Sequence, residues 1–285
     1  MRASQVISDA SLNPAALALV LAAGAAYLAG ARRAHPRWPV RRTLSFLAGL
    51  AVLAAASETG IDTWSERLLS VHMAQHLLII VAAAPLLVAG APVSLALRTL
   101  PRGGRDGLVG LLRIPAVDAL TRPPVALALL TAVLLATHVP TVYDAALTHP
   151  LVHGLEHAAY LWAALLFWAP VIAVDPLPHR LSPIGNVGYL LAAMVPMSAI
   201  GAVLISSDTV VYAPYLASAR AAGVSALADQ RSGATVMWLG GTLVLVAATL
   251  GAAWVSMLRE ERRARAREAQ ADRRAAGAST AEGAR

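Results

Sequence analysis

Long apolar runs alternate along the chain with short polar segments that are rich in arginine. Each run approaches the length of about 20 residues with which an α-helix crosses a hydrocarbon core about 30 Å thick. Seven such runs predict seven transmembrane helices, at residues 14–31, 43–61, 68–97, 123–139, 150–174, 184–205 and 233–258. The third run is the longest, and Pro85 predicts a kink within it. The predicted fold class is therefore all-α, a polytopic membrane helix bundle.

Composition agrees with a membrane bundle and excludes several other classes of protein. Apolar residues make up 58% of the 285 positions and charged residues only 14%, with a mean hydropathy of +0.62. Soluble globular domains have about 45–50% apolar and about 25% charged residues. The chain has no cysteine, which excludes thiolate metal sites, disulfides and cysteine redox motifs.

The basic residues, all 23 of them arginine, predict the orientation of the bundle. Short cytoplasmic loops carry an excess of basic residues. Nineteen arginines fall in the C-terminal tail and in the loops after the first, third and fifth spans, whereas four fall on the opposite side. We therefore expect the N-terminus outside and the C-terminus in the cytoplasm. The same asymmetry accounts for a basic pI of 10.7 without nucleic-acid binding.

Two domains follow, a seven-span membrane domain over residues 1–258 and an Arg-rich cytoplasmic tail over residues 259–285. A signal peptide cleaved near residues 29–31 would leave the five-arginine first loop outside, so we interpret the first run as a permanent span. The tail either extends the last helix or is disordered, and we expect it to be solvated rather than bound to anionic lipid. The sequence indicates no oligomeric state.

Histidine is the residue type that indicates chemistry. Six of the eight histidines map to the outer helix ends and loops: His72, His76, His138, His149, His153 and His157. Four of them form two i, i+4 pairs, one at the start of the third span and one at the start of the fifth. Residues at this spacing share a helix face, with Cβ atoms about 5–6 Å apart. Each pair can therefore bind a metal ion, and we predict one site made by His72, His76, His153 and His157.

Neighbouring polar residues are further candidates for this site. His138 ends the fourth span, and His149 caps the fifth, one turn above His153. Six acidic residues also map to the outer side: Glu58, Asp62, Asp144, Glu156, Asp208 and Asp229. We interpret most of them as loop acids or helix caps. Glu156 and Glu58 are nearest to a helix, and we expect them to orient an imidazole.

Methionines favour one metal over another. Met73 lies beside the first histidine pair, Met194 and Met197 are one turn apart in the sixth span, and Met237 opens the seventh. Thioether sulfur suits Cu(I), whereas imidazole suits zinc, copper, iron and nickel alike. Together they favour copper, as Cu(I) or Cu(II), with zinc as the second metal.

Three alternatives compete with a copper site. His153, Glu156 and His157 match the H-x-x-E-H pattern of a zinc hydrolase, but here the pattern begins a membrane helix, and we expect no enzyme. A b-type haem needs one axial histidine from each of two helices, which His76 and His157 supply, but it would leave the other member of each pair unused. A purely structural scaffold would use the histidines only as interfacial hydrogen-bonding groups.

Three ordered motifs resemble the polytopic bacterial CtaG family of cytochrome c oxidase assembly factors. They are HMAQHLL at 72–78 with APLL at 84–87 and GAP at 90–92, HGLEH at 153–157 with FW at 167–168, and ADQ at 228–230 with MWLGG at 237–241. The likeness covers residues 44–258. One departure is Arg231, where the family commonly repeats glutamine, which leaves the role of Gln230 open.

The resemblance implies a seven-helix, multi-pass protein of the bacterial plasma membrane that helps to insert copper into a respiratory oxidase. Its partners would be cytochrome c oxidase subunits and the lipid bilayer. Copper held by the four histidines at the outer face would pass to an oxidase subunit by ligand exchange. Copper transport across the membrane is the alternative, but the inner halves of the spans are largely Ala, Leu and Val, so we favour delivery.

Overall fold

A computed structural model of the protein describes residues 13–282, with no description of the side chains of 259, 263, 266, 269 and 271–282. Residues 1–12, for which the arginines predict an outward location, and 283–285, the end of the predicted tail, lie outside the described residues. The chain is 83% helical, and the described part contains no strand, so the all-α prediction is confirmed.

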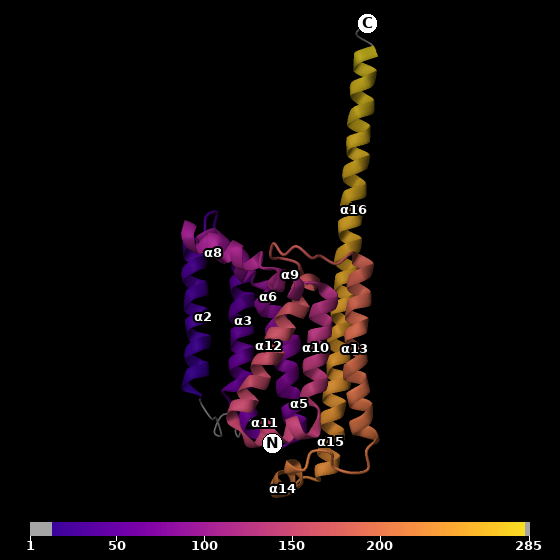
Figure 1. The fold of residues 1–285 in the computed structure, drawn as a ribbon. Coiled ribbons are helices and arrows are strands. Elements are labelled where there is room, and N and C mark those ends of the chain that lie inside the picture. Colours follow the sequence, from indigo (N-terminus) through magenta and orange to yellow (C-terminus); the bar gives the residue numbers. More distant parts are fainter. Residues whose placement is uncertain (1–12, 283–285) are drawn as a thin grey trace.

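Long helices run side by side through the bundle (Figure 1). Five are unbroken or nearly so: α2 (Pro14–Arg33), α3 (Val40–Ser57), α10 (Pro123–Thr137), α12 (Pro150–Ile172) and α13 (Pro183–Ser206). Two others are composite, and each contains a π-helical turn. The first comprises α5 (Leu69–Leu77), η1 (Leu78–Ala83), α6 (Ala84–Ala89) and α7 (Pro92–Thr99); the second comprises α15 (Ala226–Thr235), η2 (Val236–Gly240) and α16 (Gly241–Glu282).

Short helices close the two ends of the bundle. At the end from which α16 extends lie α8 (Arg102–Leu112) and α9 (Pro115–Leu120), and at the opposite end lie α4 (Gly60–Ser65), α11 (Pro140–Thr148) and α14 (Pro214–Ala221) (Figure 1). The Arg-rich tail continues the last helix as far as Glu282. Of the two alternatives, an extended helix and disorder, the described part of the tail therefore follows the first.

Within residues 13–282, six helices are long and apolar enough to cross a membrane, and there are seven spans if the bent pair α10 and α11 is counted as one. The span predicted at residues 123–139 ends in a sharp bend. Helix α10 has only 15 residues, and the chain bends by 75° into α11. Pro140 explains the break, because a residue before proline disfavours helical backbone, and Val139 is extended at φ −65° and ψ 125°.

The distortion predicted at Pro85 takes the form of the π-helix η1, which directly precedes it. Proline lacks an amide hydrogen and clashes with the carbonyl one turn earlier, so the preceding turn is wide. The indole Nε1 of Trp168 donates a hydrogen bond to the carbonyl of Ile80 in this turn, at 2.8 Å. Such a side-chain donor satisfies backbone that would otherwise be unpaired inside a membrane.

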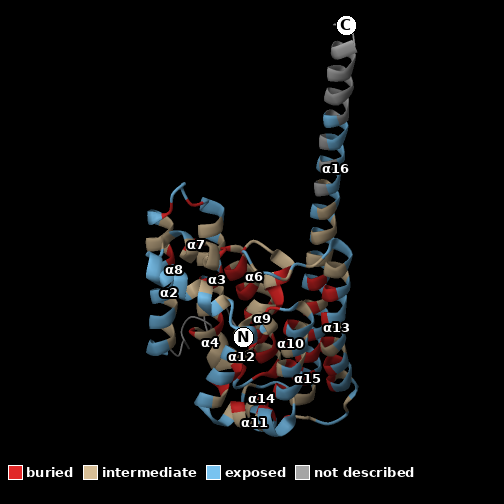
Figure 2. Cartoon of the chain, turned by 45° about the horizontal axis from the view of Figure 1, so that its top comes forward, coloured by how far each residue is buried: buried red, intermediate tan, exposed pale blue. Residues whose placement is uncertain are grey.

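Burial follows the expectation for a membrane bundle (Figure 2). The main core joins α5, α6, α10, α12, α13 and α16, whereas large apolar side chains such as Leu19 on α2 and Trp254 on α16 are exposed on the outside. Helix α2 is held at the edge by polar contacts: Trp38 Nε1 donates to the hydroxyl of Tyr27, which donates to the carbonyl of Gly90.

Gly49 tests the close approach of α3 to α6. A Cβ atom at this position would lie 2.8 Å from Leu87 Cγ and 2.9 Å from the Leu87 amide nitrogen. We expect Gly49→Ala to lower the free energy of unfolding by about 1–3 kcal/mol, the usual cost of overpacking. The measurement is thermal unfolding of the purified protein in detergent. Gly251→Ala is the matched control, because no atom lies within 4 Å of a Cβ there; equal effects of the two substitutions would contradict the packing.

Candidate metal centre

Two polar side chains position the first histidine pair by fixing the start of α5. The carboxylate of Asp229, on α15, accepts hydrogen bonds from the amide of Leu69 at 2.6 Å and from the hydroxyl of Ser70. These bonds satisfy amide groups that have no partner within the first helical turn. Asp229 is therefore a cap, as expected for most of the outer acids, but it caps a helix 160 residues away in the chain.

The second pair is positioned by the start of α12. Pro150 occupies the first helical position, which suits its fixed φ angle, and His149 is the N-cap with extended backbone. His149 is exposed and belongs to neither group of candidate ligands described below. His153 and His157 lie on the face of α12 that points toward α5.

The structure brings the four predicted histidines together. Ring centroids are 4.3 Å apart within each pair, for His72 with His76 and for His153 with His157. Between the helices they are 5.5 Å apart for His72 with His153 and 5.6 Å for His76 with His157. Each ring thus neighbours two of the other three, and the four form one compact cluster. This packing fits a small ion better than a haem, which needs a flat slot between its two axial histidines.

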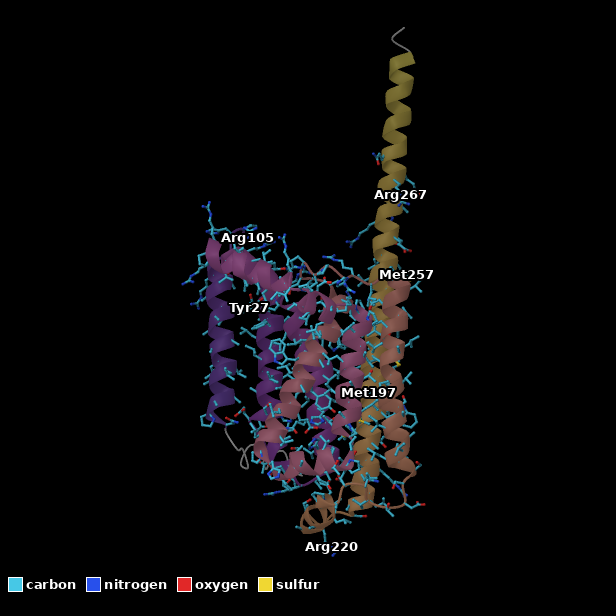
Figure 3. The ribbon with its side chains drawn as sticks, in the orientation of Figure 1. Tyr27, Arg105, Met197, Arg220, Met257 and Arg267 are labelled. Atoms are coloured by element: carbon cyan, nitrogen blue, oxygen red, sulfur yellow. The ribbon has the colours of Figure 1, made fainter. Side chains whose placement is uncertain are left out.

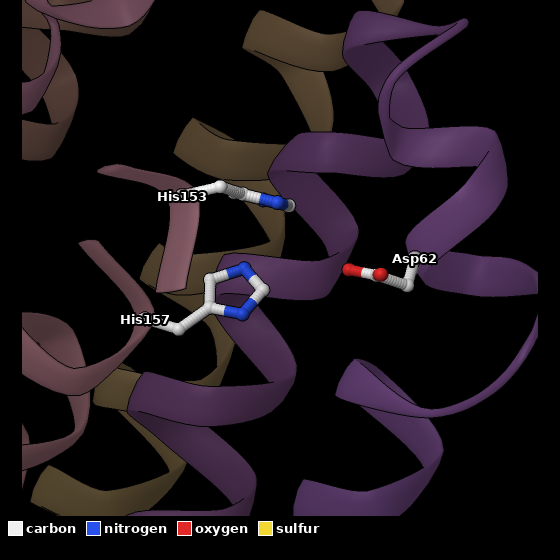
Figure 4. A group of neighbouring side chains, drawn as sticks. All are labelled: Asp62, His153 and His157. Atoms are coloured by element: carbon white, nitrogen blue, oxygen red, sulfur yellow. The ribbon is translucent and has the colours of Figure 1, made fainter. Parts of the chain in front are cut away.

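Carboxylates divide the cluster into two groups of potential ligands. His72, His76 and Glu156 form one group, and Asp62, His153 and His157 form the other; in each group the potential ligand atoms lie within 4.8 Å of one another. Figure 4 shows the side chains of the second group pointing toward one another from α12 and α4. The first group is buried throughout, whereas Asp62 and His157 are half-buried. We call these the buried group and the accessible group.

Distances in the buried group suit ligands that share an ion. The Glu156 oxygens lie 4.0 Å from His72 Nε2 and 3.8 Å from His76 Nε2, which is too long for hydrogen bonds. Ligand atoms about 2.0–2.2 Å from one tetrahedral ion lie roughly 3.3 Å apart, so a small contraction would bring all three onto one ion. Both Glu156 oxygens and both ring nitrogens of His72 and His76 are buried without a hydrogen-bond partner among the described residues.

Such unpaired polar atoms are expensive in a low-dielectric interior. A buried carboxylate costs several kcal/mol unless a charge or hydrogen bonds compensate it. A cation bound between the imidazoles and the Glu156 carboxylate would compensate it directly. The side chains present therefore fit a metal ion, and Glu156 is one of the three side chains that could hold it.

Asp62 is the site residue that sequence reasoning missed, because it was interpreted among the loop acids and caps. It lies in the first turn of α4, and Gln75 Nε2 donates to its Oδ1 at 2.8 Å and to the carbonyl of Ala56 at 2.9 Å. Gln75 stands between the two histidines of the HMAQH motif. Gln75 is the sequence signal that points to Asp62. A glutamine buried in a membrane helix needs a hydrogen-bond partner outside its own helix.

Other predicted residues are placed as follows. Glu58 belongs to neither group; its Oε2 accepts a hydrogen bond from the amide of Asn13 at 2.7 Å, at the start of α2. His138 is the C-cap of α10, and its Nδ1 lies 2.8 Å from the carbonyl of Leu134. Met73 and Met197 are buried and border a small cavity with His76 and His138, whereas Met194 packs against the main core.

Aromatic side chains cover the buried group. Tyr143 lies with its ring 5.0 Å from that of His72 and stacks on Tyr212 at 3.8 Å. Tyr212 donates to the carbonyl of His138, and Tyr215 to that of Ser65. Burial raises the pKa of both Tyr212 and Tyr215, so their hydroxyls stay protonated and neutral near pH 7. The cover therefore excludes water without adding charge.

The polar row entering the last span has a structural role. Gln230 is buried; its Oε1 accepts from the amide of Val211 at 2.8 Å, and its Nε2 donates to the carbonyls of Leu204 and Thr209. It thereby fixes the loop after α13. Arg231 is exposed and lies 3.4 Å from Asp208, so its replacement of a glutamine leaves both groups of potential ligands intact.

Comparison with known proteins places the chain beside one family of assembly factors. A family model described as cytochrome c oxidase caa3 assembly factor (Caa3_CtaG) matches residues 25–260. Uncharacterized proteins of Mycobacterium bovis and Mycobacterium tuberculosis are each 32% identical over 264 residues, and one of Mycobacterium leprae is 29% identical over 266. Each alignment covers 89% of this chain but 40% of the relative, so the chain spans less than half the length of these proteins. No solved structure matches the chain significantly.

Asp229→Ala tests how the first histidine pair is positioned. Loss of a charged acceptor for the Leu69 amide and the Ser70 hydroxyl should cost about 1.5–3 kcal/mol and loosen the first turn of α5. The measurement is amide hydrogen exchange, which should speed up in a peptide covering residues 69–77. Asp208→Ala is the control, since that side chain is 96% exposed; unchanged exchange in α5 of the Asp229 variant would show that the cap is dispensable.

Proposed function

Because the chain belongs to the cytochrome c oxidase caa3 assembly factor family, we propose that it binds copper at the outer face of the bacterial plasma membrane and delivers it to an oxidase subunit. The family supports a role in oxidase assembly. The observation that carries the finer proposal is the pair of adjoining groups of potential ligands, four imidazoles and two carboxylates, at one end of the bundle.

Copper fits these groups by its chemistry. Imidazole and carboxylate ligands suit Cu(II) and Zn(II), and imidazole also serves Cu(I). We choose copper because the client is an oxidase, with zinc as the second metal. The absence of cysteine excludes a closed thiolate cage, and imidazole ligands give a site that can release its ion.

Different exposure of the two groups suggests how delivery proceeds. The accessible group would exchange copper with a partner at the membrane surface, and the buried group would hold it away from water. His153 and His72 have adjoining rings, as do His157 and His76, so an ion can pass between the groups by replacing one ligand at a time. Each step then makes a bond as it breaks one, and the ion is never without ligands.

Arginine placement supports an outer location of the site. Figure 3 shows Arg105 at the end from which α16 extends and Arg267 on the extension itself, whereas Arg220 lies at the opposite end. The loops that carry most arginines meet at the first of these ends, where His35, Arg98, Arg105 and Arg180 border one surface pocket. By the positive-inside rule this end faces the cytoplasm, and the histidine cluster faces outward.

Two structural features favour copper delivery over hydrolysis and over copper transport. The Glu156 carboxylate lies between His72 and His76 rather than free beside a metal held by His153 and His157, so it is poorly placed as a general base. A pocket deeper in the bundle, lined by apolar residues such as Leu130, Phe167 and Leu245, offers no polar path across the membrane. An assembly role also agrees with the coarser, non-enzymatic role that the family suggests.

Histidine variants test the copper site. We expect His72→Ala and His157→Ala each to lower the affinity of the purified protein for Cu(II) and Zn(II) by at least tenfold, because each loses one of about three ligands. Equilibrium dialysis with elemental analysis measures this, and the copper content of the oxidase in cells carrying each variant measures delivery. His149→Ala is the matched control, an exposed histidine outside both groups. Wild-type protein that binds neither ion would refute the proposal and favour a structural scaffold.

Single cysteines test the orientation, because the chain has none of its own. Gly107→Cys in α8 and Ala221→Cys in α14 place exposed thiols at opposite ends and leave every arginine in place. A membrane-impermeant maleimide should label Ala221→Cys in intact spheroplasts and Gly107→Cys only after permeabilisation. The reverse pattern would put the histidine cluster on the cytoplasmic side and end the proposal of outer delivery.

A further inference from the structure

A small cavity lies beneath the buried group, on the side of His76 that faces the membrane interior. It is lined by Met73, Met197, Met237, His76 and His138, together with apolar side chains and Tyr160. The space open to the centre of a water-sized sphere is about 10 Å³, which is enough for one small ion or one water molecule. Three of the six methionines in the chain thus converge on one cavity from three separate helical segments.

Polar atoms in this cavity have no partner within the described structure. The Nε2 atom of His138 and both ring nitrogens of His76 are buried without a hydrogen bond. His138 Nδ1 donates to the carbonyl of Leu134, which leaves Nε2 as the unprotonated nitrogen with a lone pair available to a metal. The hydroxyl of Tyr160 is already engaged by Thr137, so it is a poor partner for either imidazole.

Backbone geometry adds a second, independent indication. Both π-helical turns of the protein's described part border this cavity: Ile80 belongs to η1, and Met237 belongs to η2. A π-turn is rare, costs helical hydrogen-bond geometry, and is found frequently at functional sites. The turn at Pro85 explains η1, but η2 contains no proline and has no such cause. Met237, within this turn, lines the cavity together with Met73 and His76 of α5.

The usual explanation of a buried methionine is that it fills an irregular gap in a core. That explanation is incomplete for Met73, Met197 and Met237. Side chains that only filled a gap would leave no cavity, whereas these three line a cavity together with two imidazoles. Met73, Met197 and Met237 are fully buried and line the cavity, whereas Met194, one turn from Met197, is partly buried and lies outside it. Figure 3 places Met197 between the two ends of the bundle.

We propose that Met73, Met197, Met237 and His138, with His76 at its outer edge, form a second metal site that selects Cu(I). Thioether sulfur is a soft ligand that favours Cu(I) over Cu(II) and Zn(II). His76 belongs both to this site and to the buried group, so it links the two. Binding of Cu(I) here stands independently of the accessible group; only its use as an inner station of a delivery path rests on the proposed function.

The test uses the full-length protein, purified anaerobically in detergent and loaded with Cu(I) alone. X-ray absorption at the copper edge separates sulfur from nitrogen and oxygen neighbours, and competition with a chromophoric Cu(I) chelator gives the affinity. Wild type should show copper with sulfur neighbours. The triple variant Met73→Leu/Met197→Leu/Met237→Leu should lose that sulfur signal and at least tenfold in Cu(I) affinity. Leucine conserves the volume of methionine, so the core should stay folded.

Matched controls separate this site from the outer one. Met194→Leu/Met257→Leu changes two methionines outside the cavity and should leave the sulfur signal unchanged. His138→Ala should lower Cu(I) affinity without changing Zn(II) binding by the outer groups, and it serves if the triple variant does not fold. The double variant Asp62→Ala/His153→Ala should lower Zn(II) binding and leave the sulfur signal of bound Cu(I) unchanged.

Two results would overturn the inference: wild-type protein in which Cu(I) has no sulfur neighbours, as expected if the cavity holds only water, or a sulfur signal that survives the cavity variant. Failure of the proposed outer site is distinguishable, since it would abolish Zn(II) and Cu(II) binding while Cu(I) with sulfur neighbours persists.

Discussion

The structure depends on one constraint. A carboxylate and several imidazoles are buried at one end of the membrane bundle without compensating hydrogen bonds among the described residues. Glu156 and four imidazoles lie packed at one end of the bundle, and most of their polar atoms have no protein partner within the described residues. In a soluble core of ordinary composition such a cluster would be strongly destabilising. A cation bound there, as we propose, would convert the same cluster into a stabilising one, because it would supply the opposite charge and take the lone pairs of the ring nitrogens. The proposal therefore links binding and stability at this end of the molecule.

The surrounding structure is organised to hold those side chains in place. Asp229 fixes the start of α5, Gln75 ties Asp62 to that helix, and a layer of tyrosines covers His72. Each of these side chains lies on a different helical segment from the residue that it positions or covers. Short loops and helix caps at the outer end thus set the geometry, while the long apolar helices provide the scaffold. Such a division explains why the motif residues lie at helix starts rather than at the middle of the membrane.

Arginine asymmetry and the histidine cluster give the bundle two chemically different ends. One end carries the loops rich in arginine and the extension of α16, and the other carries the potential metal ligands (Figure 1). Between them the packed interior is apolar, with the methionine-lined cavity as the step from the ligand end toward the centre. The proposed delivery at one face requires polar ligands only at the end that carries the histidine cluster. A bundle that is polar at that end and apolar in its interior meets this requirement.

Periodicity and spacing in the sequence determined the helical class, the positions of six spans, and the shared helix face within each histidine pair, His72 with His76 and His153 with His157. These follow from local rules, because apolar length sets a span and i, i+4 spacing sets a shared face. Only the tertiary structure decided that the two pairs meet, that Asp62 joins the potential ligands and Glu58 does not, that the fourth span bends after Thr137, and that Met237 meets Met73 and Met197. Each of these depends on contacts between segments that are distant in the chain, where loop geometry, caps and π-turns set the rotation of one helix against another. No local pattern encodes that rotation.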